Sequence, residues 1–194
     1  MDILVIAEEL SLRGVDVPHI RTPRLDLVSM TPAFMEAILA ERFEEAGALL
    51  GVTLPIEPLE PSVERFMSRR LEQVRLDPTV QRWLGRELAF RDAGRLVVGN
   101  AGFHGQPGVN AVDAADALEI GYGISPNHRR QGYATEAVAA LIAWARTQGI
   151  DHFVASVAPD NKPSLAIIHK LGFVRTGEHI DPDDGLEHVF ELRG

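Results

Sequence analysis

The residues best suited to chemistry form one short segment, Arg129-Arg130-Gln131-Gly132-Tyr133-Ala134-Thr135. The main-chain N–H groups at the start of a helix carry partial positive charge and attract anions. Gly132 and Ala134 allow the main chain to approach such an anion closely, and two arginines add positive charge. The segment therefore predicts a site that binds a phosphorylated ligand through its main chain.

Two elements have to position this segment. Residues 118–124 form a short apolar run that ends at the turn signal Ser125-Pro126-Asn127, which predicts a strand. A helix is predicted from about residue 134 to residue 148, with Gly149 at its end. Its apolar residues recur with a period of 3.6 and are Ala134, Val138, Leu141, Ile142 and Ala145. The anion site is thus expected where a strand leads into a helix.

Two other phosphate-binding motifs do not fit the residues. The P-loop needs Gly-x-x-x-x-Gly-Lys-Ser/Thr, a string that the chain lacks. The dinucleotide fingerprint needs Gly-x-Gly-x-x-Gly after a strand, whereas Gly121-Tyr122-Gly123 is followed by Pro126 at the position of the third glycine. Enzymes that use a nucleotide through either motif are therefore disfavoured.

Three motifs together resemble a known family, the GCN5-related N-acetyltransferases. Arg129-x-x-Gly132-x-Ala134 is similar to the Gln/Arg-x-x-Gly-x-Gly/Ala motif that cradles the coenzyme A pyrophosphate in that family. Downstream, Asn161-Lys162-Pro163-Ser164 resembles the family's Asn-x-x-Ser element, and Lys170-Leu171-Gly172-Phe173 resembles its Lys-Leu-Gly-Phe ending. Residues 21–27 resemble the first strand of the RimJ/RimL-like, ribosomal-protein branch. The resemblance covers roughly residues 20–192.

The predicted elements have the order of a mixed α/β fold. The sequence predicts a strand, two helices, a run of antiparallel strands, a βαβα unit and a terminal hairpin. The resemblance implies a mostly antiparallel sheet flanked by about four helices, in which a central parallel pair, residues 118–124 and 153–157, splays apart to admit the pantetheine arm. Residues 1–19 are expected to be an N-terminal extension, and residues 20–194 a single domain. The first helix is predicted to run from residue 32 to about residue 48.

The resemblance implies that acetyl-CoA is the co-substrate. Its pyrophosphate would lie on the N–H groups of residues 130–135, and the main chains of Tyr122 and Ile124 would pair with the pantetheine arm. Asn161 would bond to the same arm, although a helix N-cap explains this residue equally well. The complete predicted set is Tyr122, Ile124, Arg129, Arg130, Gln131, Gly132, Tyr133, Ala134, Thr135, Asn161 and Lys170.

Acetylation of an amine also needs a donor for the departing thiolate and a base for the amine. Ser164 matches the family's serine for the first task, and its place in a first helical turn also permits simple capping. Glu119 is the first candidate for the base, but strand alternation sets it opposite Tyr122, so a bulge at Gly121 or Gly123 is expected to turn it inward. The other candidates are His104, Asp183, Glu187 and His188.

Composition limits the other classes. The chain has 194 residues, 45% hydrophobic content and no cysteine, which indicates a globular protein and excludes disulfides and a cysteinyl acyl-enzyme. A net charge of −9 disfavours nucleic acid and favours a cationic amine. The apolar runs are too short for a membrane span, and the histidine spacing does not fit a metal site. A cytoplasmic protein is expected, and a homodimer is left open.

The sequence thus predicts an N-acetyltransferase that moves an acetyl group from acetyl-CoA to a primary amine, by direct attack in a ternary complex. The acceptor is a protein N-terminal α-amine or a small-molecule amine. The alternative is a non-catalytic domain that binds acyl-CoA or a protein partner. The amine side of the site is expected to be walled by the helices between residues 30 and 76 and by loop 105–117.

Overall fold

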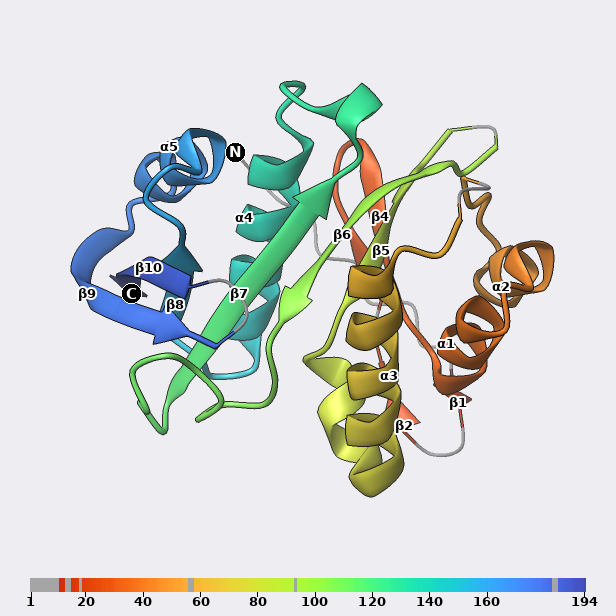
Figure 1. Cartoon of the computed structure of the whole chain (residues 1–194), viewed down its shortest axis with the longest axis horizontal. Helices are drawn as coiled ribbons and strands as arrows, with labels where there is room; N and C mark the ends of the chain where they lie inside the picture. The colour runs from red at the N-terminus through yellow and green to blue at the C-terminus, as the bar shows by residue number, and fades with distance from the viewer. Residues whose placement is uncertain (1–10, 13–14, 18, 56–57, 93, 183–184) are drawn as a thin grey trace.

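A twisted sheet organises the molecule (Figure 1). The computed structural model describes residues 11–12, 15–17, 19–55, 58–92, 94–182 and 185–194. In this part of the chain, eight strands have the order β3-β4-β5-β6-β7-β8-β10-β9, and β1 and β2 form a separate pair. The strands are β1 Ser11–Leu12, β2 Val15–Asp16, β3 Ile20–Arg21, β4 Leu25–Ser29, β5 Arg86–Phe90, β6 Val97–Phe103, β7 Ala117–Ile124, β8 His152–Val157, β9 Val174–Asp181 and β10 Gly185–Arg193.

Helices cover both faces of this sheet. Figure 1 shows α4 behind β7 and α3 in front of β5. The side chains of α4 pack into the main core with those of the central strands, while α1 to α3 form a second apolar cluster with Met30 and Leu84. The described helices are α1 Pro32–Leu39, α2 Phe43–Leu50, α3 Pro61–Leu76, α4 Tyr133–Thr147 and α5 Lys162–Lys170, with the 3-10 helices η1 Pro78–Arg82 and η2 Pro126–His128. None of the helices in the described segments is long and apolar enough to cross a membrane.

The predicted helix from residue 32 to about residue 48 is wrong in one respect, because it is two helices. Thr31 caps its start by accepting a hydrogen bond from the N–H of Phe34. The chain then turns at Glu41, which has a left-handed φ of 55°, and the N–H of Arg42 bonds back to the carbonyl of Ala37 at 2.8 Å. The break lets α1 and α2 both place apolar side chains in the same cluster, and no glycine or proline marks it in the sequence.

The parallel pair at the centre of the sheet is short. β7 pairs with β8 only at Ala117, Leu118 and Glu119. Beyond Glu119, β7 continues to Ile124 in antiparallel register with β6, while β8 continues in register with β10. The two central strands therefore diverge, which confirms the predicted splay.

One buried acid makes the stability of this sheet depend on pH. Glu87 lies on β5 between its cross-strand neighbours Val28 and Asn100 and is 7% exposed. Burial raises the pKa of Glu87 from its ordinary value of 4.5 to about 8. Because the folded protein holds this proton more tightly than the unfolded chain, the free energy of unfolding decreases as the pH rises from about 4.5 to about 8.

Replacing Glu87 with glutamine is expected to remove this pH dependence. A carboxylate that must stay protonated costs on the order of 3 kcal/mol at pH 7 and less than about 1 kcal/mol at pH 5. Glu87→Gln should therefore stabilise the protein at pH 7 and change it little at pH 5, as measured by denaturant unfolding at both values. Glu44→Gln, at an exposed site on α2, is the control. Equal effects of Glu87→Gln at the two pH values would contradict the assignment.

Candidate functional site

The cleft beside the splayed strands holds the predicted anion-binding segment. A cavity of about 720 Å³ lies between the end of β7 and the starts of α4 and α5. Its lining includes two arginines and no aspartate or glutamate. The lining residues are Tyr122, Gly123, Ile124, Pro126, His128, Arg129, Arg130, Gly132, Tyr133, Ala134, Thr135, Asn161, Pro163, Ser164 and Ile167.

The start of α4 has the geometry of an anion-binding turn. Arg130 and Gly132 both adopt left-handed conformations, with φ values of 60° and 84°. Gly132 is the N-cap, and the first intrahelical bond runs from the N–H of Glu136 to the carbonyl of Gly132 at 3.0 Å. The N–H groups of residues 133–135 precede that bond, so the helix provides them with no carbonyl partner. They lie in the cavity wall, where the helix dipole favours negative charge.

The exposed edge of β7 offers main-chain groups to the same cavity. The N–H of His104 bonds to the carbonyl of Glu119, and the N–H of Ser125 bonds to the carbonyl of Val98, so the odd-numbered residues of β7 face β6. Alternation then turns the main-chain groups of Tyr122 and Ile124 toward the gap beside β8. The carbonyl of Ile124 already accepts a bond of 3.0 Å from Nε of Arg129, so a ligand would meet Ile124 through its N–H or displace Arg129.

The start of α5 closes the opposite wall. Asn161 is the N-cap of this helix, and its Oδ1 accepts a hydrogen bond of 3.3 Å from the main-chain N–H of Ser164. The capping contact therefore uses the side chain of Asn161 and only the main chain of Ser164. The hydroxyl of Tyr122 lies 3.4 Å from the carbonyl of Ser164, and burial raises the pKa of Tyr122, which keeps this phenol protonated.

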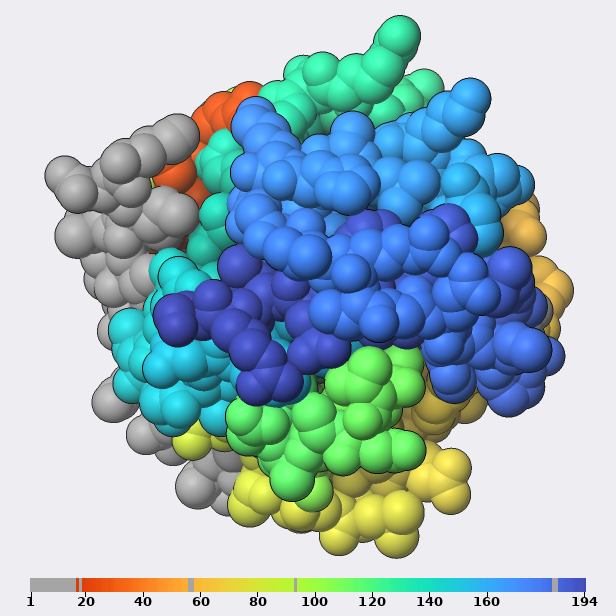
Figure 2. Space-filling view, turned by 90° about the vertical axis from the view of Figure 1, so that its left-hand side faces the viewer, coloured from red at the N-terminus to blue at the C-terminus, as the bar shows by residue number. Residues whose placement is uncertain are grey.

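A second cavity, of about 580 Å³, meets the first one at Tyr122, Asn161 and Ser164. It lies under the hairpin of β9 and β10, beside loop 105–116, and Figure 2 shows these segments side by side on that face. Three carboxylate side chains and no lysine or arginine belong to its lining. The carboxylates are those of Glu119, Asp181 and Glu187. Besides these and the three residues shared with the first cavity, the lining consists of His104, Val109, Asn110, Ala111, Ile120, Gly121, Ala155, Ser156, Val157, Ala158 and His179.

Glu119 reaches this second cavity without the predicted bulge. The register between β6 and β7 is continuous from Ile120 to Ile124, so that expectation was wrong. Beyond Glu119, β7 and β8 are no longer paired, so the gap between them is accessible from both faces of the sheet. Glu119 and Tyr122, on opposite faces of β7, can therefore line the same cavity. Glycine at position 121 instead leaves room for the ring of His104, because a Cβ atom there would lie 2.9 Å from Nε2 of His104.

Glu119 is 4% exposed, and its carboxylate is held by several donors. Its oxygens accept hydrogen bonds from the N–H of Ala111 at 2.7 Å and from the hydroxyl of Ser156 at 2.6 Å. Nδ1 of His104 lies 3.7 Å from Oε1 of Glu119, and 46% of the His104 side chain is exposed. Burial lowers the pKa of His104, Glu119 raises it and Arg70 lowers it further, so the net effect favours a neutral imidazole.

Several predicted residues lie elsewhere. Gln131 does not line either cavity, and its carbonyl accepts a bond from Arg24. Lys170, the last residue of α5, also lies outside both linings, as does His188, whose Nε2 is 3.9 Å from Glu178. Asp183 lies outside the described residues. The predicted helical wall between residues 30 and 76 contributes no lining residue, and its place is taken by the hairpin of β9 and β10.

Sequence reasoning overlooked three groups at the site. The first two are the phenol of Tyr122 and the hydroxyl of Ser156, and the third is the pair of β9 side chains His179 and Asp181. Of these residues, only Tyr122 could have been found from the sequence, because its main chain was already predicted to pair with the cofactor. In the described part of the chain, no group of three or more histidine, aspartate or glutamate side chains has the arrangement of a metal site.

Comparison with known sequences assigns the family. The profile of the acetyltransferase (GNAT) domain matches residues 24–174, so the chain belongs to the GNAT family. Uncharacterized N-acetyltransferase YjdG of Bacillus subtilis is 37% identical over 79 residues, which are 40% of this chain and 44% of that protein. The chain thus spans less than half of that relative. Uncharacterized N-acetyltransferase YoaA, also of Bacillus subtilis, is 28% identical over 162 residues, which are 82% of this chain and 85% of that protein.

Solved structures share the fold at low sequence identity. An acetyltransferase of Agrobacterium tumefaciens is 22% identical with a TM-score of 0.60, over 96% of this chain and 99% of that one. RimL, described as a ribosomal L7/L12 α-N-protein acetyltransferase, is 17% identical with a TM-score of 0.62, over 96% and 100%. The microcin C7 self-immunity acetyltransferase MccE, solved with acetyl-CoA and AMP, is 14% identical with a TM-score of 0.59, over 89% and 94%. These likenesses confirm the mixed α/β GNAT fold.

Proposed function

We propose that the protein is an acetyl-CoA-dependent N-acetyltransferase that acetylates a primary amine. The observation that carries this proposal is the meeting of two cavities of opposite charge. One has arginines and a helix start in its wall, and the other has three carboxylates. An anionic cofactor in the first and a cationic amine in the second would meet at Tyr122, Asn161 and Ser164. Membership of the GNAT family supports the same assignment.

Acetyl-CoA fits the first cavity in a defined direction. Its pyrophosphate lies on the N–H groups at the start of α4, with Arg129 and Arg130 beside it, since both features favour an anion. The pantetheine arm follows the exposed edge of β7, and its amides pair with the main chain of Tyr122 and the N–H of Ile124. Its thioester then reaches the junction with the second cavity. Asn161 donates to the same arm through Nδ2, because its capping contact uses only Oδ1.

The reaction is a direct transfer. The amine nitrogen attacks the thioester carbonyl carbon, the C–S bond breaks, and the amine loses one proton while the thiolate gains one. We assign the base to His104, because its imidazole is half exposed to the cavity and its pKa is lowered by burial. Glu119 orients that ring and balances the charge that forms on it. The hydroxyl of Ser164 donates to the leaving thiolate, and that of Tyr122 is the alternative donor.

The acceptor class follows from the charges and the base. Glu119, Asp181 and Glu187 favour a cationic molecule in the second cavity. An α-amine has an ordinary pKa of about 7.7–8.0 and a lysine amine about 10.4, so a histidine base suits an α-amine better. The likeness of residues 21–27 to the RimJ/RimL-like branch favours a protein N-terminus. We therefore propose an N-terminal α-amine, with small-molecule amines as the second choice.

An amine panel tests this function. The protein should bind coenzyme A in calorimetry and release it from acetyl-CoA when a peptide with a free N-terminus is added. The same peptide with an acetylated N-terminus is the control and should release none. Binding without release for any amine would favour the non-catalytic alternative, and a protein that does not bind coenzyme A would overturn the cofactor assignment as well.

A further inference from the structure

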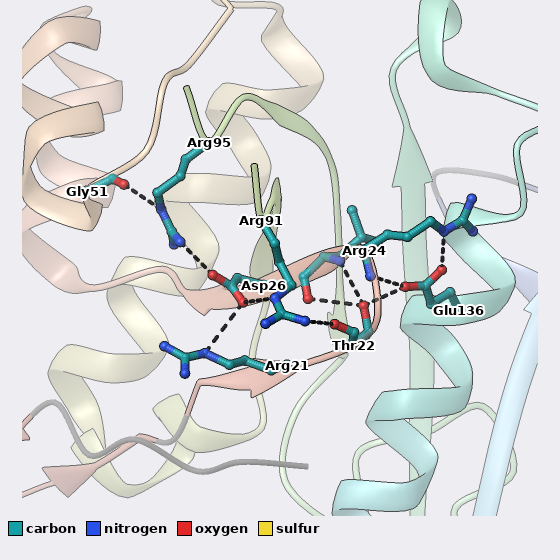
Figure 3. A network of polar contacts seen from close by, with 9 residues as sticks. Arg21, Thr22, Arg24, Asp26, Gly51, Arg91, Arg95 and Glu136 are labelled. Atoms are coloured by element: carbon teal, nitrogen blue, oxygen red, sulfur yellow. Dashed lines mark hydrogen bonds and ion pairs between the residues drawn. The ribbon is translucent and has the colours of Figure 1, made fainter. Parts of the chain in front are cut away.

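The turn between β3 and β4 contacts the start of α4, although more than 100 residues separate them (Figure 3). Arg24 makes most of the contacts. Its Nη1 donates to the carbonyl of Gln131 at 2.9 Å, and its Nε donates to Oε2 of Glu136 at 2.6 Å. Its guanidinium also lies over the ring of Tyr133, at 4.4 Å from the ring centre. One side chain thus touches two residues of the anion-binding turn, Gln131 and Tyr133, and Glu136 just beyond it.

These contacts support the conformation that the turn needs. Gln131 lies between Arg130 and Gly132, which both have left-handed φ values. Such a conformation is unfavourable for a residue other than glycine, so Arg130 needs support from its surroundings. A Cβ atom on Gly132 would lie 3.4 Å from Nη2 of Arg24. The guanidinium therefore lies against the turn and bonds to the carbonyl in its middle.

Arg24 also neutralises an acid that opposes anion binding. Glu136 lies in the first turn of α4, close to the N–H groups that face the cavity. Its Oε1 accepts bonds from the main-chain N–H of Arg24 at 2.9 Å and from the hydroxyl of Thr22 at 2.6 Å. Burial alone would raise the pKa of Glu136, but the bonds from Thr22 and Arg24 outweigh this and lower it. Without Arg24, an unbalanced carboxylate would remain beside the bound phosphates.

We propose that Arg24 is a positioning residue of the coenzyme A pyrophosphate site. It holds residues 130–132 in their anion-binding conformation and balances the charge of Glu136. This inference rests on the proposed use of coenzyme A. It also explains why an arginine is needed, since only its planar fork reaches Glu136 and Gln131 together.

A neighbouring cluster provides a matched control. Asp26 is 3% exposed and pairs with three arginines, as Figure 3 shows. Nη1 of Arg95 lies 2.5 Å from Oδ2 of Asp26, and Nε of Arg91 lies 3.7 Å from Oδ1. Arg91 also donates to the carbonyl of Thr22 at 2.9 Å. Arg91 therefore stabilises the same hairpin as Arg24, but it contacts Asp26 and Thr22 and not the turn before α4.

The test compares coenzyme A binding by Arg24→Gln, Arg91→Gln and the wild type in calorimetry. Arg24→Gln should weaken binding by about 10- to 100-fold, whereas Arg91→Gln should change it less than about threefold. Adding Glu136→Gln to Arg24→Gln should recover part of the loss, because the unbalanced charge is removed. With an accepted amine, Arg24→Gln should raise KM for acetyl-CoA and leave kcat nearly unchanged. Melting temperatures of all variants report on folding.

Three results would overturn the inference while leaving the proposed function intact. They are wild-type affinity in Arg24→Gln, equal losses in Arg24→Gln and Arg91→Gln, and a fall in kcat with unchanged KM. If Arg24→Gln does not fold, Arg24→Lys takes its place. It retains the charge but loses the fork, so it should still weaken binding several-fold, and unchanged affinity would reject the positioning role. A wild type that does not bind coenzyme A would instead overturn the proposed function.

Discussion

Replacing Ser164 with alanine is expected to lower kcat by roughly 10²- to 10⁴-fold, the usual range for loss of general acid assistance. The affinity for coenzyme A should hardly change, because a bond to the sulfur matters mainly when negative charge develops on it. The melting temperature should also change little. The capping bond at the start of α5 runs from the main-chain N–H of Ser164 to Asn161, and alanine retains that N–H.

Two matched variants complete this experiment. Asn161→Ala removes the capping side chain and should destabilise the protein by about 0.5–2 kcal/mol. Tyr122→Phe removes the other hydroxyl at the junction of the two cavities and should leave kcat within a few-fold of the wild type. A full single-turnover rate in Ser164→Ala, together with a large loss in Tyr122→Phe, would transfer the role of donor from Ser164 to Tyr122.

Replacing Gly132 with aspartate is expected to weaken coenzyme A binding by at least about 100-fold, which corresponds to about 2.7 kcal/mol. Two effects act together. The residue has a left-handed φ of 84°, which any side chain makes less favourable, and the new carboxylate would lie at the anion-binding turn and repel the phosphates. Calorimetry with coenzyme A measures the change directly.

The neutral counterpart, Gly132→Asn, separates these effects. Asparagine has nearly the same shape as aspartate and tolerates the left-handed region better than most residues. It should therefore weaken binding about tenfold or less, and the remaining difference from Gly132→Asp reports on charge. If the two variants bind coenzyme A equally well, phosphate does not lie at this turn. The salt dependence of the remaining affinity gives a second measure of the charge effect.

Local features of the fold were predictable because they depend on neighbours in the sequence. The strand before Ser125 and the helix that begins at Tyr133 follow from apolar periodicity and from glycine at the helix start. The cap at Asn161 follows from the preference of asparagine for that position. The break at Glu41 was not predictable, because a left-handed residue other than glycine is stabilised by the packing of α1 against α2 and not by its own type.

The candidate site also has a part that could be predicted from the sequence and a part that could not. The sequence by itself determined the turn and helix start at residues 129–135 and predicted an anion site there, because that chemistry belongs to the main chain of one continuous segment. A family motif also predicted that Ser164 acts on the thioester. Only the tertiary structure decided how the second cavity is formed, since its wall combines β7, loop 105–116, β8 and the hairpin of β9 and β10.

Tertiary packing also decides the surroundings of Glu119 and Arg24, which the sequence did not reveal. Glu119 is held by Ala111 and Ser156, and Arg24 is held by Gln131 and Glu136. Each partner belongs to a different element. The sequence contains many groups that could bond to a carboxylate or a guanidinium, and only the folded structure brings a particular one within reach. Local spacing determines where a helix or a turn begins, whereas the charge balance of a buried side chain depends on the elements that packing brings to it.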